Sequence, residues 1–249
     1  QMLFERFGDE VYTKGYRIYT TITKADQEAA YAALRRGVLD YDKRHGYRGP
    51  EGYTEIPAEG QPDEDLEESL SEESDSDDLL AAVVLEASPR QVRAYRRGGE
   101  IVTIAGEGLK FAQKMLDENA APNKKIRRGA LIRIQKDEKR NWQIVQLPEA
   151  EAALVAISPG DGRVRALVGG FDFNRNKFNH VTQAWRQPGS SFKPFIYSAA
   201  LEKGFTPATI VNDAPVVVDA AQTGGQTWQP HNYDSKYDGP MRLRMGLAK

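Results

Sequence analysis

A serine and a lysine three positions apart are the residues of this sequence best suited to chemistry. Ser190 follows a Pro-Gly pair, and Lys193 is followed by Pro194. In a helix, residues three apart lie on one face, about 5–6 Å apart at Cβ, so the two side chains can hydrogen-bond directly. A serine hydroxyl becomes a nucleophile when an adjacent base takes its proton. A lysine can be that base only when it is neutral, which desolvation or a neighbouring cation favours.

The flanking residues indicate how this pair is held at the start of a helix. Gly189 allows unusual backbone dihedral angles just before Ser190, and Pro194 fits a first helical turn. The partial positive charge of a helix N-terminus also disfavours an ammonium nearby. The apolar residues within 195–201 predict that the helix continues into a core. Taken alone, the pattern also fits an N-capping serine beside a surface lysine.

Composition excludes several classes of function. With 249 residues and a net charge of −2, the chain allows one large or two ordinary domains and gives no electrostatic case for nucleic acid or an anionic membrane. It has no cysteine, and its histidines, His45, His180 and His231, are too scattered for a local metal pair. We therefore expect no metal and no cofactor. No apolar run is long enough to span a bilayer, and Gln1 suggests a chain cut from a longer protein.

The elements expected before the serine begin with a strand over residues 15–23 and a helix over 29–41. Thr23, with Asp26 three residues later, is typical of a helix N-terminus. A linker rich in Gly, Pro and Glu is expected over 50–62. The acidic run that follows, residues 63–78, is interpreted as a solvated segment covering the domain behind it, with Leu66 and Leu70 spaced for a short helix.

Short apolar stretches separated by turn residues then predict an OB-like barrel of five strands with one helical patch at 109–116. Gly98-Gly99 predicts a hairpin turn. Two basic clusters are interpreted as solvated groups facing the acidic run, because few aromatic residues accompany them. The predicted strands are 80–85, 91–95, 100–104, 130–134 and 142–147, and the clusters are Arg90, Arg93, Arg96, Arg97 and Lys124, Lys125, Arg127, Arg128.

After the barrel, alternating apolar residues over 153–157 and 164–168 flank a Pro-Gly turn and predict a hairpin that leads to the Ser190 helix. Residues 208–222 are expected to form strand and loop. A further helix is expected to begin within 241–249.

Penicillin-binding proteins and class A β-lactamases share the Ser-x-x-Lys motif. Four longer stretches of this sequence resemble class A high-molecular-weight penicillin-binding proteins of the 1A type. They are Leu-Val-Gly-Gly at 167–170, Ala-Trp-Arg-Gln-Pro-Gly-Ser-Ser-Phe-Lys-Pro-Phe at 184–195, Glu-Lys-Gly-Phe-Thr-Pro-Ala at 202–208 and Trp-Gln-Pro-His-Asn-Tyr at 228–233.

The resemblance implies an α+β fold: an incomplete penicillin-binding/transpeptidase domain, similar to serine β-lactamases, with an inserted small all-β OB-like barrel. Residues 1–60 would be a linker and the N-terminal part of the transpeptidase domain. Residues 61–150 would be the barrel with its acidic leading segment, and residues 151–249 the next part of the transpeptidase domain.

The same resemblance implies a D,D-transpeptidase of peptidoglycan synthesis, part of a bifunctional glycosyltransferase/transpeptidase that β-lactams acylate. Ser190 and Lys193 are the expected catalytic residues. Trp228, Asn232 and Tyr233 come from the stretch that lines the approach to the cleft in the family, although Asn232 also fits an ordinary turn. The expected partners are stem peptides, β-lactams and a protein or glycan at the barrel. The expected location is the periplasmic side of a bacterial inner membrane, reached through a segment outside this chain.

Two motifs of the family, Ser-x-Asn and Lys-Thr-Gly, do not occur in suitable context after Ser190. The second oxyanion donor is expected from the strand that carries Lys-Thr-Gly, and losing one such donor typically costs about 10²–10³ in rate. We therefore expect the 249 residues alone to be inactive. Two other readings stay open at this point: a β-lactamase or carboxypeptidase, in which water resolves the acyl-enzyme, and a binding module in which the barrel recruits a glycan or protein.

Overall fold

The computed structural model describes residues 2–56 and 62–249, which group into two units, Gln1–Ala184 and Trp185–Lys249. The first unit contains α1 (Met2–Phe7), α2 (Glu10–Thr13), α3 (Lys24–Arg44), β1 (Gly52–Tyr53), α4 (Pro62–Ser71), β2 (Leu80–Ala87), β3 (Gln91–Arg96), β4 (Glu100–Ala105), the 3₁₀ helix η1 (Gly106–Met115), β5 (Ala130–Lys136), β6 (Trp142–Val145), β7 (Leu154–Ile157) and β8 (Val164–Val168). The second contains the 3₁₀ helix η2 (Gly189–Phe192), α5 (Lys193–Glu202), β9 (Ile210–Asp213), α6 (Ala220–Thr223), β10 (Gly239–Arg242) and α7 (Leu243–Ala248).

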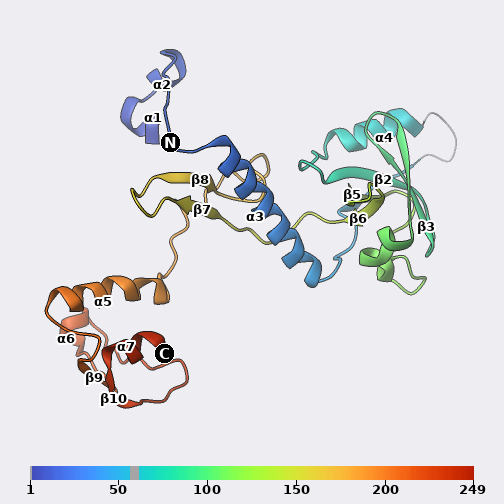
Figure 1. Cartoon of the computed structure of the whole chain (residues 1–249). Helices are drawn as coiled ribbons and strands as arrows, with labels where there is room; N and C mark the ends of the chain where they lie inside the picture. Colours follow the sequence, from blue (N-terminus) through green and yellow to red (C-terminus); the bar gives the residue numbers. More distant parts are fainter. Residues whose placement is uncertain (1, 57–61) are drawn as a thin grey trace. The chain divides into compact units, whose positions relative to one another are not determined.

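The five strands predicted for the OB-like domain are confirmed as β2 to β6. Together with β1 they form one antiparallel sheet in the order β1-β5-β2-β3-β4, with β6 also paired to β5; Figure 1 labels β2, β3, β5 and β6. Gly98 and Gly99 lie between β3 and β4 at φ +84° and +80°, a left-handed conformation that glycine adopts at low cost. The predicted hairpin turn is therefore confirmed.

The sheet is not a closed barrel, because no ladder joins β4 to β6 among the described strands. The predicted helical patch, η1, contacts both strands instead. Gly108 makes this approach possible, since a Cβ there would lie 2.2 Å from the Trp142 carbonyl oxygen and 2.9 Å from Ile104 Cγ2. The 3₁₀ helix η1 thus packs closely on both strands at the place where no ladder joins β4 to β6.

Both faces of β2 are buried, because successive side chains of a strand point to opposite sides. Ala82 and Val84 belong to the core under η1, whereas Val83 packs with Leu66 and Leu70 of α4. The acidic run therefore begins as an amphipathic helix on the sheet (Figure 1), with its two leucines buried. This agrees with its interpretation as a covering segment.

Helix α3 packs on the β7–β8 hairpin, and both elements were predicted. Thr23 is the N-cap of α3, and its Oγ1 accepts from the Asp26 N–H at 3.4 Å and donates to the Asp26 carboxylate at 2.7 Å. Leu34 and Val38 are buried against Val168 of β8. The capping signal and the apolar spacing thus predicted both the start and the buried face of this helix.

The strand predicted over residues 15–23 is not formed. Only its end reaches β8, where Thr21 Oγ1 donates to the Val164 carbonyl at 2.6 Å and the Thr23 N–H to the Arg165 carbonyl at 3.1 Å. Tyr19 is 87% exposed. The β-branched and aromatic composition was misleading because a strand needs a partner for its backbone, and no described strand pairs with residues 15–20.

The predicted linker over 50–62 contains β1, which pairs with β5 at Gly52↔Leu131 and Tyr53↔Ala130. Residues 57–61 of that linker lie outside the described residues. The part that is described is therefore an edge strand of the OB-like sheet.

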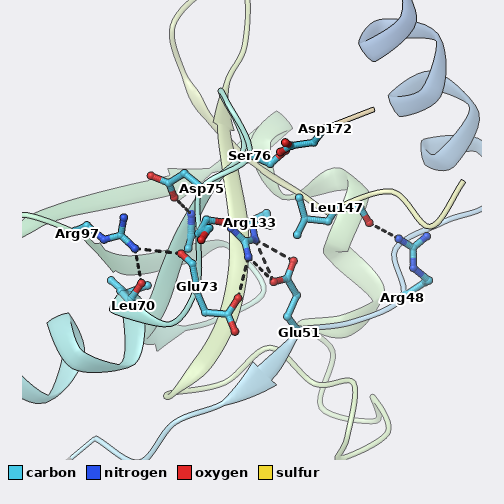
Figure 2. Close-up of polar contacts among 12 residues, drawn as sticks. Arg48, Glu51, Leu70, Glu73, Asp75, Ser76, Arg97, Arg133, Leu147 and Asp172 are labelled. Atoms are coloured by element: carbon cyan, nitrogen blue, oxygen red, sulfur yellow. Dashed lines mark hydrogen bonds and ion pairs between the residues drawn. The ribbon is translucent and has the colours of Figure 1, made fainter. Parts of the chain in front are cut away.

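Two arginines, the buried Arg133 and the exposed Arg97, hold the segment after α4, as Figure 2 shows. Arg133 of β5 is 2% exposed. Its guanidinium donates to both carboxylate oxygens of Glu51, to the Glu73 carboxylate and, at 2.8 Å, to the Ser74 carbonyl. Arg97 donates to the carbonyls of Leu70 and Glu73. Of the first basic cluster, Arg97 thus faces the acidic run as interpreted. Its neighbours pair within the sheet, Arg93 with Glu86 and Arg96 with Glu100.

A second polar group joins this segment to the elements around α3. Arg35 of α3 is buried and donates to the Ser76 carbonyl and to Asp78, both at 2.9 Å. Ser76 Oγ donates to the buried Asp172 carboxylate at 2.6 Å. Burial alone would raise the pKa of Asp172, but hydrogen bonds from Ser76 and from backbone N–H groups outweigh it and lower that pKa.

In the second unit, β9 and β10 form an antiparallel ladder that pairs Asp213 with Gly239. The helix predicted within 241–249 is confirmed as α7, and the strand and loop predicted over 208–222 are β9 followed by the short α6. The expected core under α5 is not present among the described residues: Phe195 is 67% and Ile196 56% exposed. The apolar run forms the helix, but the described hairpin and α7 are too small to cover it.

Candidate active site

Ser190 lies in η2, which runs directly into α5, so the predicted helix start is confirmed with a 3₁₀ first turn. Gly189 has φ +53°, which favours glycine and turns the chain just before the serine. Lys193 is the first residue of α5, and its N–H donates to the Ser190 carbonyl. In a 3₁₀ turn, residues i and i+3 are eclipsed, so the two side chains project from the same side.

The two side chains lie on one cavity of about 820 Å³. Ser190 is exposed and Lys193 half-buried. No hydrogen bond joins Ser190 Oγ to Lys193 Nζ among the described contacts, although catalytic hydrogen bonds often tighten only when substrate binds. The cavity is lined by Ser190, Lys193, Tyr197, Val211, Asn212, Asp213, Asn232, Tyr233, Asp234, Lys236, Asp238, Met241, Gly246 and Lys249.

Two of the three residues expected along the cleft lie on this cavity. Asn232 and Tyr233 line it, and Tyr233 is fully exposed. Trp228 does not line it; it forms an isolated bridge with Val218, with N···O distances of 2.9 and 3.0 Å. Asn232 is both a lining residue and a turn residue, since its backbone carbonyl accepts from the Ser235 N–H at 2.9 Å.

Most of the lining residues were not predicted as site residues from the sequence, and Tyr197 and Asp213 are two of them. Tyr197 lies one turn beyond Lys193 on α5, and the i, i+4 spacing could have indicated it. Its hydroxyl lies close to α7, where a Cβ on Gly246 would be 3.1 Å away. Asp213 ends β9, and no local pattern links it to a site 23 residues from Ser190.

Asp213 accepts more side-chain and backbone hydrogen bonds than the other described carboxylates that line the cavity. The Asn232 amide donates to both of its oxygens, at 2.9 and 3.0 Å, and the Asp238 N–H donates to Oδ2 at 2.9 Å. The Asp238 N–H first, and the Asn232 amide second, lower the pKa of the Asp213 carboxyl. Lys249 pairs with Asp238 at 2.7 Å, and this hydrogen bond raises the pKa of Lys249.

Among the described residues, no group of three or more His, Asp or Glu side chains could hold a metal ion. The Nδ1 atom of each histidine instead lies within hydrogen-bonding distance of an oxygen. The partner is the Tyr41 carbonyl for His45, the Gly169 carbonyl for His180 and the Tyr237 hydroxyl for His231. In that same part of the chain, no helix has the length and apolar content needed to cross a membrane.

Two family profiles match the chain, one after the other. Residues 47–150 match the penicillin-binding protein OB-like domain, and residues 152–249 match the penicillin-binding protein transpeptidase domain. The three-part division expected from the sequence, 1–60, 61–150 and 151–249, stays a prediction.

The chain is similar over its whole length to penicillin-binding proteins 1A. It is 41% identical over 248 residues to the protein of Neisseria flavescens and 42% identical over 256 residues to that of Escherichia coli K12. It spans 31% and 30% of the length of those two relatives. The crystal structure of penicillin-binding protein 1A from Haemophilus influenzae matches all of this chain with a TM-score of 0.77 at 35% identity, and the match covers 36% of that protein.

The two profiles, the full-length similarity and the structural match agree with the OB-like sheet and the serine-lysine turn described above. The chain therefore belongs to the penicillin-binding proteins of the 1A type.

Proposed function

We propose that this chain supplies the nucleophile and base of a serine D,D-transpeptidase that cross-links peptidoglycan stem peptides. The observation that carries the proposal is the placement of Ser190 and Lys193 on one cavity, inside the stretch that matches the transpeptidase domain. The full protein would be a bifunctional glycosyltransferase/transpeptidase acting on the periplasmic side of a bacterial inner membrane.

In the proposed reaction, Ser190 Oγ attacks the penultimate D-Ala carbonyl carbon while Lys193 takes up the hydroxyl proton. The tetrahedral intermediate collapses, the peptide C–N bond breaks, and the terminal D-Ala leaves with a proton returned by the base. An amine of a neighbouring strand then attacks the ester, forms the cross-link and frees Ser190. The Ser190 N–H lies at the nucleophile itself and would be one of the two oxyanion donors.

A β-lactam would enter the same sequence of steps. Its ring amide opens when Ser190 Oγ attacks the carbonyl carbon and becomes acylated. The amine stays tethered to the acyl group, so no leaving group departs and the ester persists. Labelling by a fluorescent penicillin therefore reports the first half of the reaction without the second substrate.

Alanine in place of Ser190 tests the proposal in the full-length protein. The nucleophile is then missing, so we expect no penicillin labelling and no cross-linking. Ser191→Ala is the matched control, because Ser191 is the neighbouring exposed serine of η2 and does not line the cavity. Undiminished labelling of Ser190→Ala would remove the proposed function.

We also propose that the OB-like domain contacts a protein or glycan partner. It has its own core and exposes Ile101 of β4, 51% accessible, on its sheet. Pull-down of envelope proteins and glycan strands with wild type and Ile101→Lys tests this. Lost capture with unchanged penicillin labelling is the expected result, and unchanged capture would contradict it.

A further inference from the structure

The loop over residues 232–238, named here the cleft loop, forms one wall of the Ser190 cavity. It supplies Asn232, Tyr233, Asp234, Lys236 and Asp238 to the lining. Tyr233 is fully exposed on it. An exposed aromatic side chain held beside a nucleophile offers a large contact area with few rotatable bonds, so it can bind ligand well if its backbone is already fixed.

Asp213 fixes both ends of the cleft loop from outside it. At the loop's start the Asn232 amide donates to both Asp213 oxygens, and at its end the Asp238 N–H donates to Oδ2. The Asn232 amide also donates to the Lys236 carbonyl at 2.8 Å, which ties the loop to itself. One carboxylate on β9 thus closes a loop that starts 19 residues later.

The backbone inside the cleft loop depends on this closure. Ser235 has φ +58°, an uncommon conformation for a residue other than glycine. Its N–H donates to the Asn232 carbonyl at 2.9 Å, and the Lys236 N–H donates to Asp234 Oδ1 at 3.0 Å. Such a turn persists when surrounding contacts determine it, and the Asp213 hydrogen bonds are the contacts that anchor it to the sheet.

We propose that Asp213 is a positioning residue of the active site: through Asn232 and the Asp238 backbone it presents Tyr233 and Lys236 to the ligand acylated at Ser190. This inference rests on the proposed function. Asp213 itself touches no reacting atom in the reaction written above. Its loss therefore weakens the binding of substrate and β-lactam before acylation and affects the acylation step less.

Asp213→Asn in the full-length protein tests this role, because one carboxylate oxygen becomes an amide that cannot accept from Asn232 or Asp238. We expect the apparent Kd of a fluorescent penicillin before acylation to rise about tenfold or more, the usual effect of losing hydrogen bonds to a charged group. The limiting acylation rate should change much less, as for a group that acts on binding. Asp219→Asn is the matched control, since Asp219 is an exposed aspartate of the same unit, makes no side-chain cap and does not line the cavity.

Exchanging the side chains of Asp213 and Asn232 distinguishes a role in positioning the cleft loop from a general loss of folding. In Asp213→Asn with Asn232→Asp, the new amide can donate to the new carboxylate and its oxygen can still accept from the Asp238 N–H, but position 232 loses its donor to the Lys236 carbonyl. We expect this pair to recover part of the lost affinity, a coupling that independent sites do not show. If Asp213→Asn does not fold, Asn232→Ala carries the test in its place, with the same loss of affinity expected.

Wild-type affinity in both Asp213→Asn and Asn232→Ala would overturn the inference. If Ser190→Ala is at the same time not labelled by penicillin, the proposed function still stands. A double exchange no better than Asp213→Asn alone would also count against the inference. Labelling of Ser190→Ala at the wild-type rate would remove the proposed function and this inference together.

Discussion

In the proposed reaction Lys193 takes up the Ser190 proton and later returns it, and this makes the chemical identity of the amine testable. An arginine at this position keeps the positive charge but cannot be deprotonated in a protein. We expect Lys193→Arg to slow penicillin acylation by about 10²–10⁴-fold, the usual contribution of a general base. Stopped-flow labelling of the full-length protein measures it.

The control for this change is Lys203→Arg, at the C-terminal end of the same helix and outside the cavity. It should acylate at the wild-type rate. If Lys193→Arg also acylates at that rate, another group takes the proton, and the role given to Lys193 is wrong.

The ionisation of Asp172 leads to a prediction about acid stability. Its pKa is lowered from the ordinary value of 3.8, so its carboxylate stabilises the fold fully above that value. This contribution is lost as the pH falls through the lowered pKa and the carboxyl group becomes protonated. We expect the Tm to fall with acid in wild type and to fall less steeply in Asp172→Asn, measured by circular dichroism. An unchanged slope would show that Asp172 does not contribute to the acid transition.

At the scale of the elements, side-chain contacts from Arg133 hold the segment that follows α4. Arg133→Met removes the buried group that binds Glu51, Glu73 and the Ser74 carbonyl, while keeping an unbranched apolar side chain. Removing one partner of a buried ion pair typically destabilises by about 3–5 kcal/mol, and the partial exposure of both glutamates places the expected loss near the lower end.

Urea unfolding of the full-length protein, followed in the OB-like domain by hydrogen exchange of the β5 backbone amides, measures this loss. Arg90→Met, at an exposed arginine, is the control and should change the unfolding free energy little. Equal midpoints for both variants would show that the arginine contacts seen in Figure 2 do not stabilise this segment.

At the scale of the whole molecule, the chain contains the Ser190 turn and the cleft loop but neither Ser-x-Asn nor Lys-Thr-Gly after Ser190 in its sequence. We expect the 249-residue polypeptide not to be acylated by excess penicillin, because the loss of even one oxyanion donor typically costs about 10²–10³ in rate. Mass spectrometry of the intact polypeptide tests this, with the full-length protein as the positive control. A stoichiometric penicilloyl adduct on Ser190 would contradict it.

Local signals predicted most of the elements correctly. These signals involve residues only a few positions apart, so they can be recognised directly in the sequence. Examples are the Gly98-Gly99 turn, the Thr23 cap, and the apolar spacing of α3 and of the β7–β8 hairpin. The strand expected over 15–23 was wrong because a strand depends on a distant partner. The core expected under α5 was wrong for a related reason: an apolar run favours burial but does not state which other residues will cover it.

The sequence by itself predicted Ser190 and Lys193 as a candidate pair, and it determined the OB-like order of strands and the family. Only the tertiary structure brought Asp213 to Asn232, left Trp228 off the cavity, and joined Arg133 to Glu51 across 82 residues. The physical reason is that a helical turn or a hairpin forms from neighbouring residues with fixed periodicity. A hydrogen bond between distant residues depends on how the whole backbone returns on itself, and no local pattern records that path.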